Sequence, residues 1–157
     1  MIRSIDLEKK FVAHLVLNDN TYLETVLSIC HEMALKYHSA NLINGLLTDE
    51  QCRVVFLAAT SIERAFAEPT PINIARWLIA HRHAKPFGVS SDEAAIAAQV
   101  KKLAEDSLEK VAPTVANVMF FDSMLASMSR QRSITTAMDR AQDIIKTGPG
   151  KIEDRYY

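Results

Sequence analysis

Glycine is scarce in this sequence, with four among 157 residues. No segment shows the sustained two-residue alternation of apolar and polar residues that marks a half-buried strand. Apolar residues recur instead at spacings of three and four in one segment after another. Together with an apolar content of 48%, these features predict a globular all-α chain that is long enough to bury a core of its own.

Cysteine and long apolar runs are also scarce. Cys30 and Cys52 are the only cysteines, and they lack the CxxC spacing of redox and metal motifs. The opening stretch, MIRSIDLEKK, lacks the apolar core of a signal peptide. The longest apolar run, Val54–Ala59, is too short to cross a bilayer. We therefore expect a cytoplasmic protein without membrane contact, with both cysteines reduced and buried.

The sequence has little net charge. Its formal value of −1 predicts no strong general attraction to nucleic acid, and we expect no strong DNA binding by this chain alone. Basic residues can still cluster locally, as they do at the end of one predicted helix: Arg76, His81, Arg82, His83 and Lys85. Cations are favourable at a helix C-terminus, and we prefer that interpretation to a phosphate-binding patch.

Motifs of catalysis, nucleotide binding and metal binding are missing. The stretch from Gly148 to Lys151 lacks the spacing and the Ser/Thr of a P-loop, and no predicted strand precedes it. His31 and His38 are seven residues apart, whereas the HExxH zinc motif places its histidines four apart. The sequence offers no paired carboxylates, nucleophile elbow or triad spacing, so we expect no enzyme activity, no cofactor and no metal.

Cap residues and apolar periodicity divide the first two thirds of the chain into helices. Caps are expected at Ser4, at the box that begins with Thr48, and at Thr70 with Pro71 in the first helical turn. Two further capping boxes begin at Thr21 and Ser90. The predicted helices cover about 6–17, 21–37, 48–66, 71–81 and 91–107. Their shared core should contain Phe11, Leu15, Phe56, Trp77, Leu78 and Val100.

The remaining stretch predicts an antiparallel hairpin of two helices. Its arms span about Val115–Met128, capped by Thr114, and Ser133–Lys146, which stops at Gly148. The first arm carries two apolar stripes, one through Val118, Phe121, Leu125 and Met128 and one through Ala116, Phe120 and Met124. One stripe can cover the sister arm, whose own stripe runs from Ile134 to Ile145. The other needs a further partner, either the rest of the chain or a second copy.

The order of these signals resembles the N-terminal domain of DnaB-type replicative helicases. The resemblance covers 7–146 and implies a divergent or phage-like member. The residues that carry it are Glu8, Val12, Leu15–Leu17, Asp19, Leu23, Val26, Arg53, Val55, Phe56, Pro71–Leu78, Val100, Leu103, Pro113–Asn117, Phe121, Arg130 and Arg132.

This resemblance implies a helical head (1–112), a helical hairpin (113–147) and the start of a linker (148–157). It also implies a non-catalytic collar domain that pairs subunits as dimers or hexamers and docks primase or a helicase loader in DNA replication. The full-length parent would carry the ATPase motor. The surface expected to serve these contacts comprises Val118, Phe120, Phe121, Met124, Leu125, Met128, Arg130, Arg132 and Met138.

Two other functions compete with the collar domain. Leu47–Gln51, followed by Pro69–Pro71 and a helix, loosely imitates a winged-helix DNA-binding regulator, although no two-strand wing follows. The chain is also compatible with a free-standing homologue of the helicase domain that modulates a replicative helicase.

Overall fold

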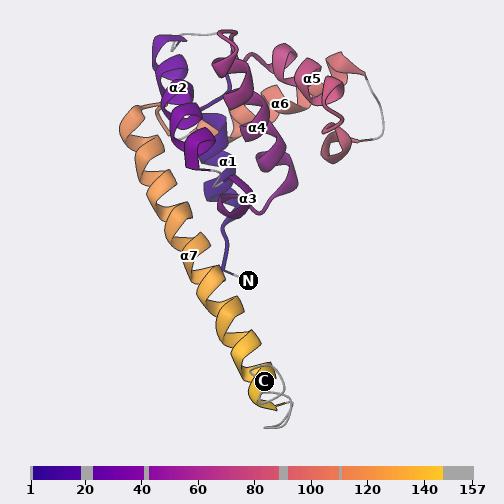
Figure 1. The fold of residues 1–157 in the computed structure, drawn as a ribbon. Coiled ribbons are helices and arrows are strands. Elements are labelled where there is room, and N and C mark those ends of the chain that lie inside the picture. Colours follow the sequence, from indigo (N-terminus) through magenta and orange to yellow (C-terminus); the bar gives the residue numbers. More distant parts are fainter. Residues whose placement is uncertain (1, 19–22, 41–42, 89–91, 110, 147–157) are drawn as a thin grey trace.

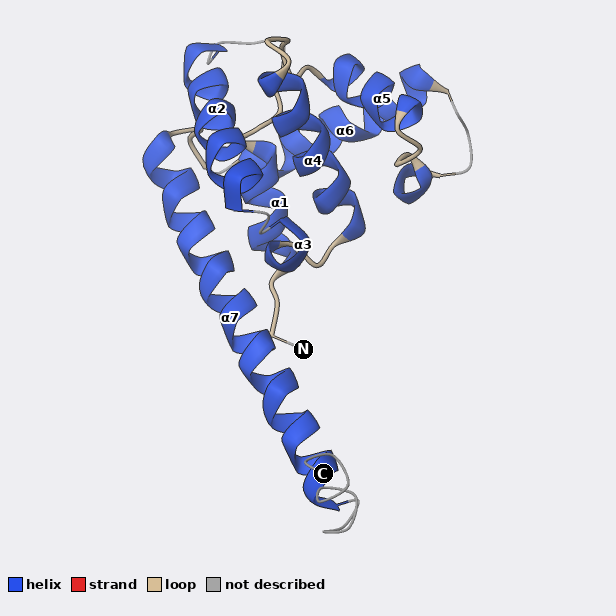
Figure 2. Cartoon of the chain, viewed as in Figure 1, coloured by secondary structure: helices blue, strands red, loops and turns tan. Residues whose placement is uncertain are grey.

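The computed structural model describes residues 2–18, 23–40, 43–88, 92–109 and 111–146, and these residues form helices and loops without a strand (Figures 1 and 2). The all-α prediction is therefore confirmed. Some predictions fall wholly or partly outside the described residues: the linker, the helix stop at Gly148, and the capping boxes that begin at Thr21 and Ser90. The helices are α1 (Ile5–Ala13), α2 (Leu23–Ala40), α3 (Ile43–Leu46), α4 (Glu50–Arg64), α5 (Pro71–Ala80), the short 3-10 helix η1 (Lys85–Phe87), α6 (Glu93–Leu108) and α7 (Val115–Lys146).

Three of the predicted caps start their helices as expected. Ser4 accepts a hydrogen bond from the backbone N–H of Leu7 at 3.3 Å, Thr70 from Asn73 at 3.2 Å, and Thr114 from an orphan N–H of α7 at 3.1 Å. Each side chain satisfies a donor that has no partner inside its own helix. Pro71 occupies the first turn of α5, where it loses no helical hydrogen bond.

The cap of α4 was predicted one residue too early. Asp49, and not Thr48, accepts the hydrogen bond from the Cys52 N–H, at 3.0 Å. Thr48 donates its hydroxyl to the buried carboxylate of Glu8 at 2.6 Å. That carboxylate also accepts from the backbone N–H groups of Thr48 and Asp49. Glu8 of α1 therefore anchors the start of α4, a tertiary contact that the local pattern could not reveal.

Two helices are followed by a non-glycine residue in the left-handed conformation. Phe66 follows α4 with φ of 61°, and Arg82 follows α5 with φ of 59°. The next N–H in each case reaches back to a carbonyl of the last turn, as in a Schellman motif. Helix α1 ends at Ala13, four residues before the predicted Leu17, whose N–H instead donates to the Pro69 carbonyl at 2.9 Å.

The head buries one apolar core among its first six α-helices. Helix α5 packs on α6, α1 packs on α6, and α2 and α5 both pack on α4. Five of the six predicted core residues are fully buried: Phe11, Leu15, Phe56, Leu78 and Val100. Trp77 is the exception, since it is only half-buried against this core. Its indole stacks on His81 at a centroid distance of 4.1 Å, so it lies at the boundary and not in the interior.

The predicted hairpin is wrong, because the last stretch forms one continuous helix. Helix α7 runs from Val115 to Lys146 without a turn at the expected tip, 129–132. That tip reads Ser-Arg-Gln-Arg and contains neither glycine nor proline, so nothing local stops the helix. The inner stripe of the first arm packs on the head instead of on a sister arm. It needs no second arm to bury it.

The first half of α7 lies along the head and its second half extends beyond it (Figure 1). Val118, Phe121 and Leu125 are buried against the head. Helix α7 contacts α1, α2 and α3, and Gly45 permits the close approach of α3, because a Cβ there would lie 3.3 Å from Ser129 Oγ. From Ser133 to Lys146, every residue except the half-buried Ile144 is exposed.

Candidate functional site

An exposed apolar stripe runs along the outer side of α7. Its positions alternate in steps of four and three residues, which is the spacing of a coiled-coil seam. The exposed fractions of its large side chains are 59% for Phe120, 60% for Ile134, 58% for Met138 and 69% for Ile145. We call this stripe the α7 seam; it comprises Phe120, Met124, Ser127, Gln131, Ile134, Met138, Ala141 and Ile145.

The structure divides the predicted association surface between two faces of α7. Val118, Phe121 and Leu125 face the head and are buried, so they are not available to a partner. Phe120 and Met138 lie in the seam and are exposed. Met124, Met128 and Arg132 are half-buried, and Arg130 is exposed. Of the two predicted stripes, the one through Phe121 and Leu125 is therefore buried against the head, and the one through Phe120 and Met124 faces outward.

Sequence reasoning missed the length of this seam. It placed Ile134 and Ile145 on a second arm, facing the first. The signal was present in the sequence, since Phe120, Ile134 and Ala141 are separated by multiples of seven residues. A heptad register that is the same on both sides of 129–132 indicates one helix with one seam.

Arg132 joins α7 to the head through carbonyl oxygens. It donates to the Ile2 carbonyl at 2.8 Å, to Gly45 at 2.7 Å and to Leu46 at 3.4 Å. The last two carbonyls end α3, where a cation is favourable. Its partners are dipoles and not anions, so the positive charge of Arg132 is solvated but not neutralised.

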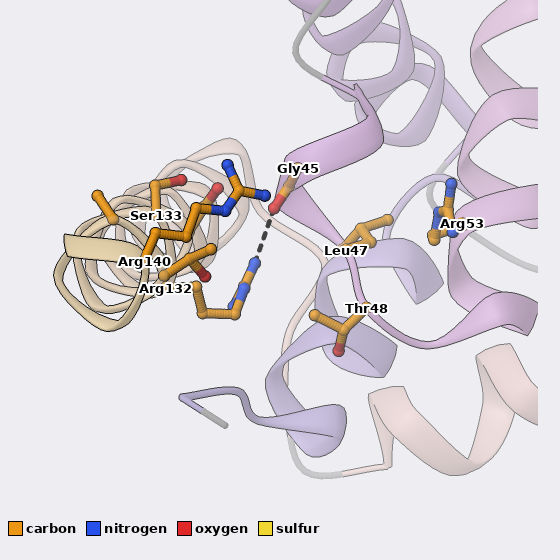
Figure 3. A pocket seen from close by; sticks show the side chains of 10 residues that line it. Gly45, Leu47, Thr48, Arg53, Arg132, Ser133 and Arg140 are labelled. Carbon is orange, nitrogen blue, oxygen red and sulfur yellow. Dashed lines mark hydrogen bonds between the residues drawn. The ribbon is translucent and has the colours of Figure 1, made fainter. Parts of the chain in front are cut away.

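A cleft of about 500 Å³ lies between α7 and the α3–α4 corner. Figure 3 shows Arg132 and Arg140 on the α7 side and Arg53 on the α4 side. None of the described residues that line it is acidic, and neither Arg53 nor Arg140 forms an ion pair with another described residue. The hydroxyl groups of Thr136, Ser129 and Ser133 add neutral donors. We call this site the arginine cleft.

A second basic cleft adjoins the first through a shared residue. It has a volume of about 370 Å³, and Arg53 lines both clefts. Its other cationic or titratable residues are Arg82, His83 and Lys85, with Glu50 as its one acid among the described residues. His83 also stacks on Trp77, at a centroid distance of 5.7 Å and an interplanar angle of 11°. The predicted basic end of α5 therefore carries an aromatic stack.

The described residues offer little for nucleophilic or metal chemistry. They contain no group of three His, Cys, Asp or Glu residues placed to hold a metal ion. Burial raises the pKa of the Cys30 and Cys52 thiols, which keeps both protonated and unreactive. His31 faces Glu63 at 3.4 Å and His38 faces Arg64 at 2.6 Å, so the two histidines belong to separate pairs. No described helix is both long and apolar enough to cross a membrane.

No protein-family model matches this chain, and neither a curated protein nor a solved structure matches it. The geometry of α7 and of the two clefts therefore carries the functional argument.

Proposed function

We propose that this chain is a self-associating helical module whose copies pair through the α7 seam. The main support is that four large apolar side chains are exposed at heptad spacing on a helix that projects from the head. Such a stripe of exposed apolar side chains on a helix marks an interaction surface. A second copy fits it, because a two-fold pair places the same stripe on both partners.

The size of the seam favours a reversible pair. Burying one large apolar side chain contributes about 1.5–3 kcal/mol, and a symmetric pair buries each side chain in two copies. Association costs about 4–15 kcal/mol in lost freedom, which offsets much of this gain, so we expect a reversible pair. The polar residues in the middle of the seam, Ser127 and Gln131, resemble the polar interruptions that set register and partner number at some cost in stability.

Pairing through α7 is the property that a replicative-helicase collar domain requires. The collar assignment, with docking of primase or a loader, remains a proposal that rests on the resemblance in the sequence. The hairpin that the resemblance implied is absent, so a collar pair would have to form between single long helices. A modulator that binds the helicase as a free-standing homologue would use the same surface. The winged-helix alternative gains no support, because the described residues include no strand.

Sedimentation equilibrium of matched charge variants tests the pairing. Phe120→Glu and Ile134→Glu each place a carboxylate in the seam, and we expect each to shift the chain from dimer to monomer. Thr136→Glu adds the same charge to the opposite face of α7 and should leave the dimer intact. Gln131→Leu removes a polar interruption and should tighten the pair. An unmodified chain that stays monomeric at high micromolar concentration refutes the proposal, as does a Thr136→Glu variant that dissociates as readily as the seam variants.

A further inference from the structure

The two basic clefts share one lining residue, Arg53, and we call the cations of both clefts together the cationic track. Arg132 and Arg140 lie at one end of the track on α7, and Arg53 links the arginine cleft to the neighbouring one. Arg82, just after α5, and Lys85, the first residue of η1, mark the other end. These cations come from parts of the chain far apart in sequence, so the tertiary fold gathers them.

Cations that share a track repel one another unless an anion lies between them. Neither Glu8 nor Glu50 fills that role. The carboxylate of Glu8 lies behind Thr48, buried, and accepts three hydrogen bonds there. Glu50 faces only the second cleft. The described lining of the arginine cleft therefore carries positive charge without an acid. Arginine, with its planar fork of donors, suits phosphate oxygens.

An aromatic stack lies at one end of this track. The indole of Trp77 is parallel to the imidazoles of His81 and His83, with interplanar angles of 16° and 11°. Both histidines are exposed, and His83 lines the second cleft. Exposed flat rings beside a groove of cations are the combination that holds unpaired bases while the cations hold the phosphates.

We propose that this track binds single-stranded nucleic acid, with Arg53, Arg132 and Arg140 contacting consecutive phosphates and the Trp77 stack contacting a base. The near-neutral net charge argues only against strong non-specific attraction, because a net charge does not show where cations are clustered. Binding should therefore be moderate and strongly salt-dependent. The track faces the head side of α7, opposite the seam by helical phase, so strand binding and pairing are compatible.

Fluorescence anisotropy of the full chain with a labelled oligothymidylate tests this inference. Arg53→Gln with Arg140→Gln removes two cations that form no ion pair with another described residue. We expect at least a roughly tenfold loss of affinity at low salt. The slope of the logarithm of affinity against that of salt should fall by about 1.4, from about 0.7 for each lost contact to a single strand. The matched control, Arg64→Gln with Lys102→Gln, makes the same change in net charge outside both clefts and should alter affinity less than about twofold.

Two further readouts separate the alternatives. Trp77 is the only tryptophan in the chain, so stacking of a base should quench its fluorescence, whereas inorganic tripolyphosphate should not. Arg53→Lys with Arg140→Lys should recover most of the salt dependence. The inference is overturned if no oligonucleotide binds at low salt, if tripolyphosphate binds and the oligonucleotide does not, or if both glutamine variants weaken binding equally. The seam variant Phe120→Glu should still bind the strand, which keeps this test independent of pairing.

Discussion

A buried carboxylate of α7 should contribute measurably to holding this helix on the head. The side chain of Asp122 is 3% exposed. One of its oxygens accepts a hydrogen bond from the Tyr37 hydroxyl and the other from the Lys36 ammonium, both on α2. Burial is the main cause of a raised pKa for Tyr37, and the nearby Asp122 carboxylate raises it further. The phenol therefore remains a donor throughout the neutral range.

The expected loss follows from the exposure of each partner. A hydrogen bond from the buried Tyr37 hydroxyl to a charged acceptor is worth about 1.5–3 kcal/mol. The Lys36 side chain is 42% exposed, so water screens its ion pair and adds only about 0–1 kcal/mol. Asp122→Ala should therefore lower the free energy of unfolding by about 2–3 kcal/mol. Asp122→Asn keeps an acceptor for Tyr37 and should cost about 1 kcal/mol.

Urea unfolding followed by circular dichroism measures these losses. The variants are best compared in the Phe120→Glu background at one protein concentration, because dimerisation would make stability depend on concentration. A double-mutant cycle of Asp122→Ala with Tyr37→Phe should give a coupling energy of about 1–2 kcal/mol. A coupling below about 0.5 kcal/mol would show that this contact does not hold α7 on the head, and our account of its seating would be wrong.

Three other predictions concern the head. Phe56→Ala should lower the free energy of unfolding by about 3–5 kcal/mol because the ring is fully buried. Trp77→Ala should lower it by only about 1–2 kcal/mol because the indole is half-buried. Equal losses for the two variants would contradict these burials. Burial lowers the pKa of His14, so the unfolded chain takes up a proton first as pH falls below about 6.5. The stability that neutral His14 contributes is thus present above that pH and lost below it, and His14→Gln should flatten the decline in urea midpoint between about pH 7 and 5; an unchanged slope would refute this. Phe66→Gly should raise stability by about 0.5–1 kcal/mol, because glycine removes the left-handed strain and the lost ring is 98% exposed; a loss of stability would mean that the ring makes contacts.

Much of the helical pattern could be predicted from the sequence because it depends on local chemistry. A side-chain oxygen at Ser4, Thr70 or Thr114 reaches an N–H three residues away whatever the rest of the fold does. The inward faces of α1, α4 and α6 follow from spacing along a helix, which explains why Phe56 and Val100 were correctly assigned to the core. The errors at Thr48 and Leu17 arose where a distant residue, Glu8 or Pro69, supplied the competing hydrogen bond.

The sequence by itself determined that the chain is helical and that the stretch Val115–Met128 has two apolar stripes. Only the tertiary structure decided which stripe is buried, because the head offers a surface for Phe121 and Leu125 and thereby removes the need for a hairpin. The same holds for the arginine cleft. Arg53 and Arg140 are 87 residues apart in the sequence numbering, and no local spacing relates them. They line one cleft because α3 seats on α7 through Gly45 and the carbonyl contacts of Arg132, long-range contacts that arise only when the chain is packed.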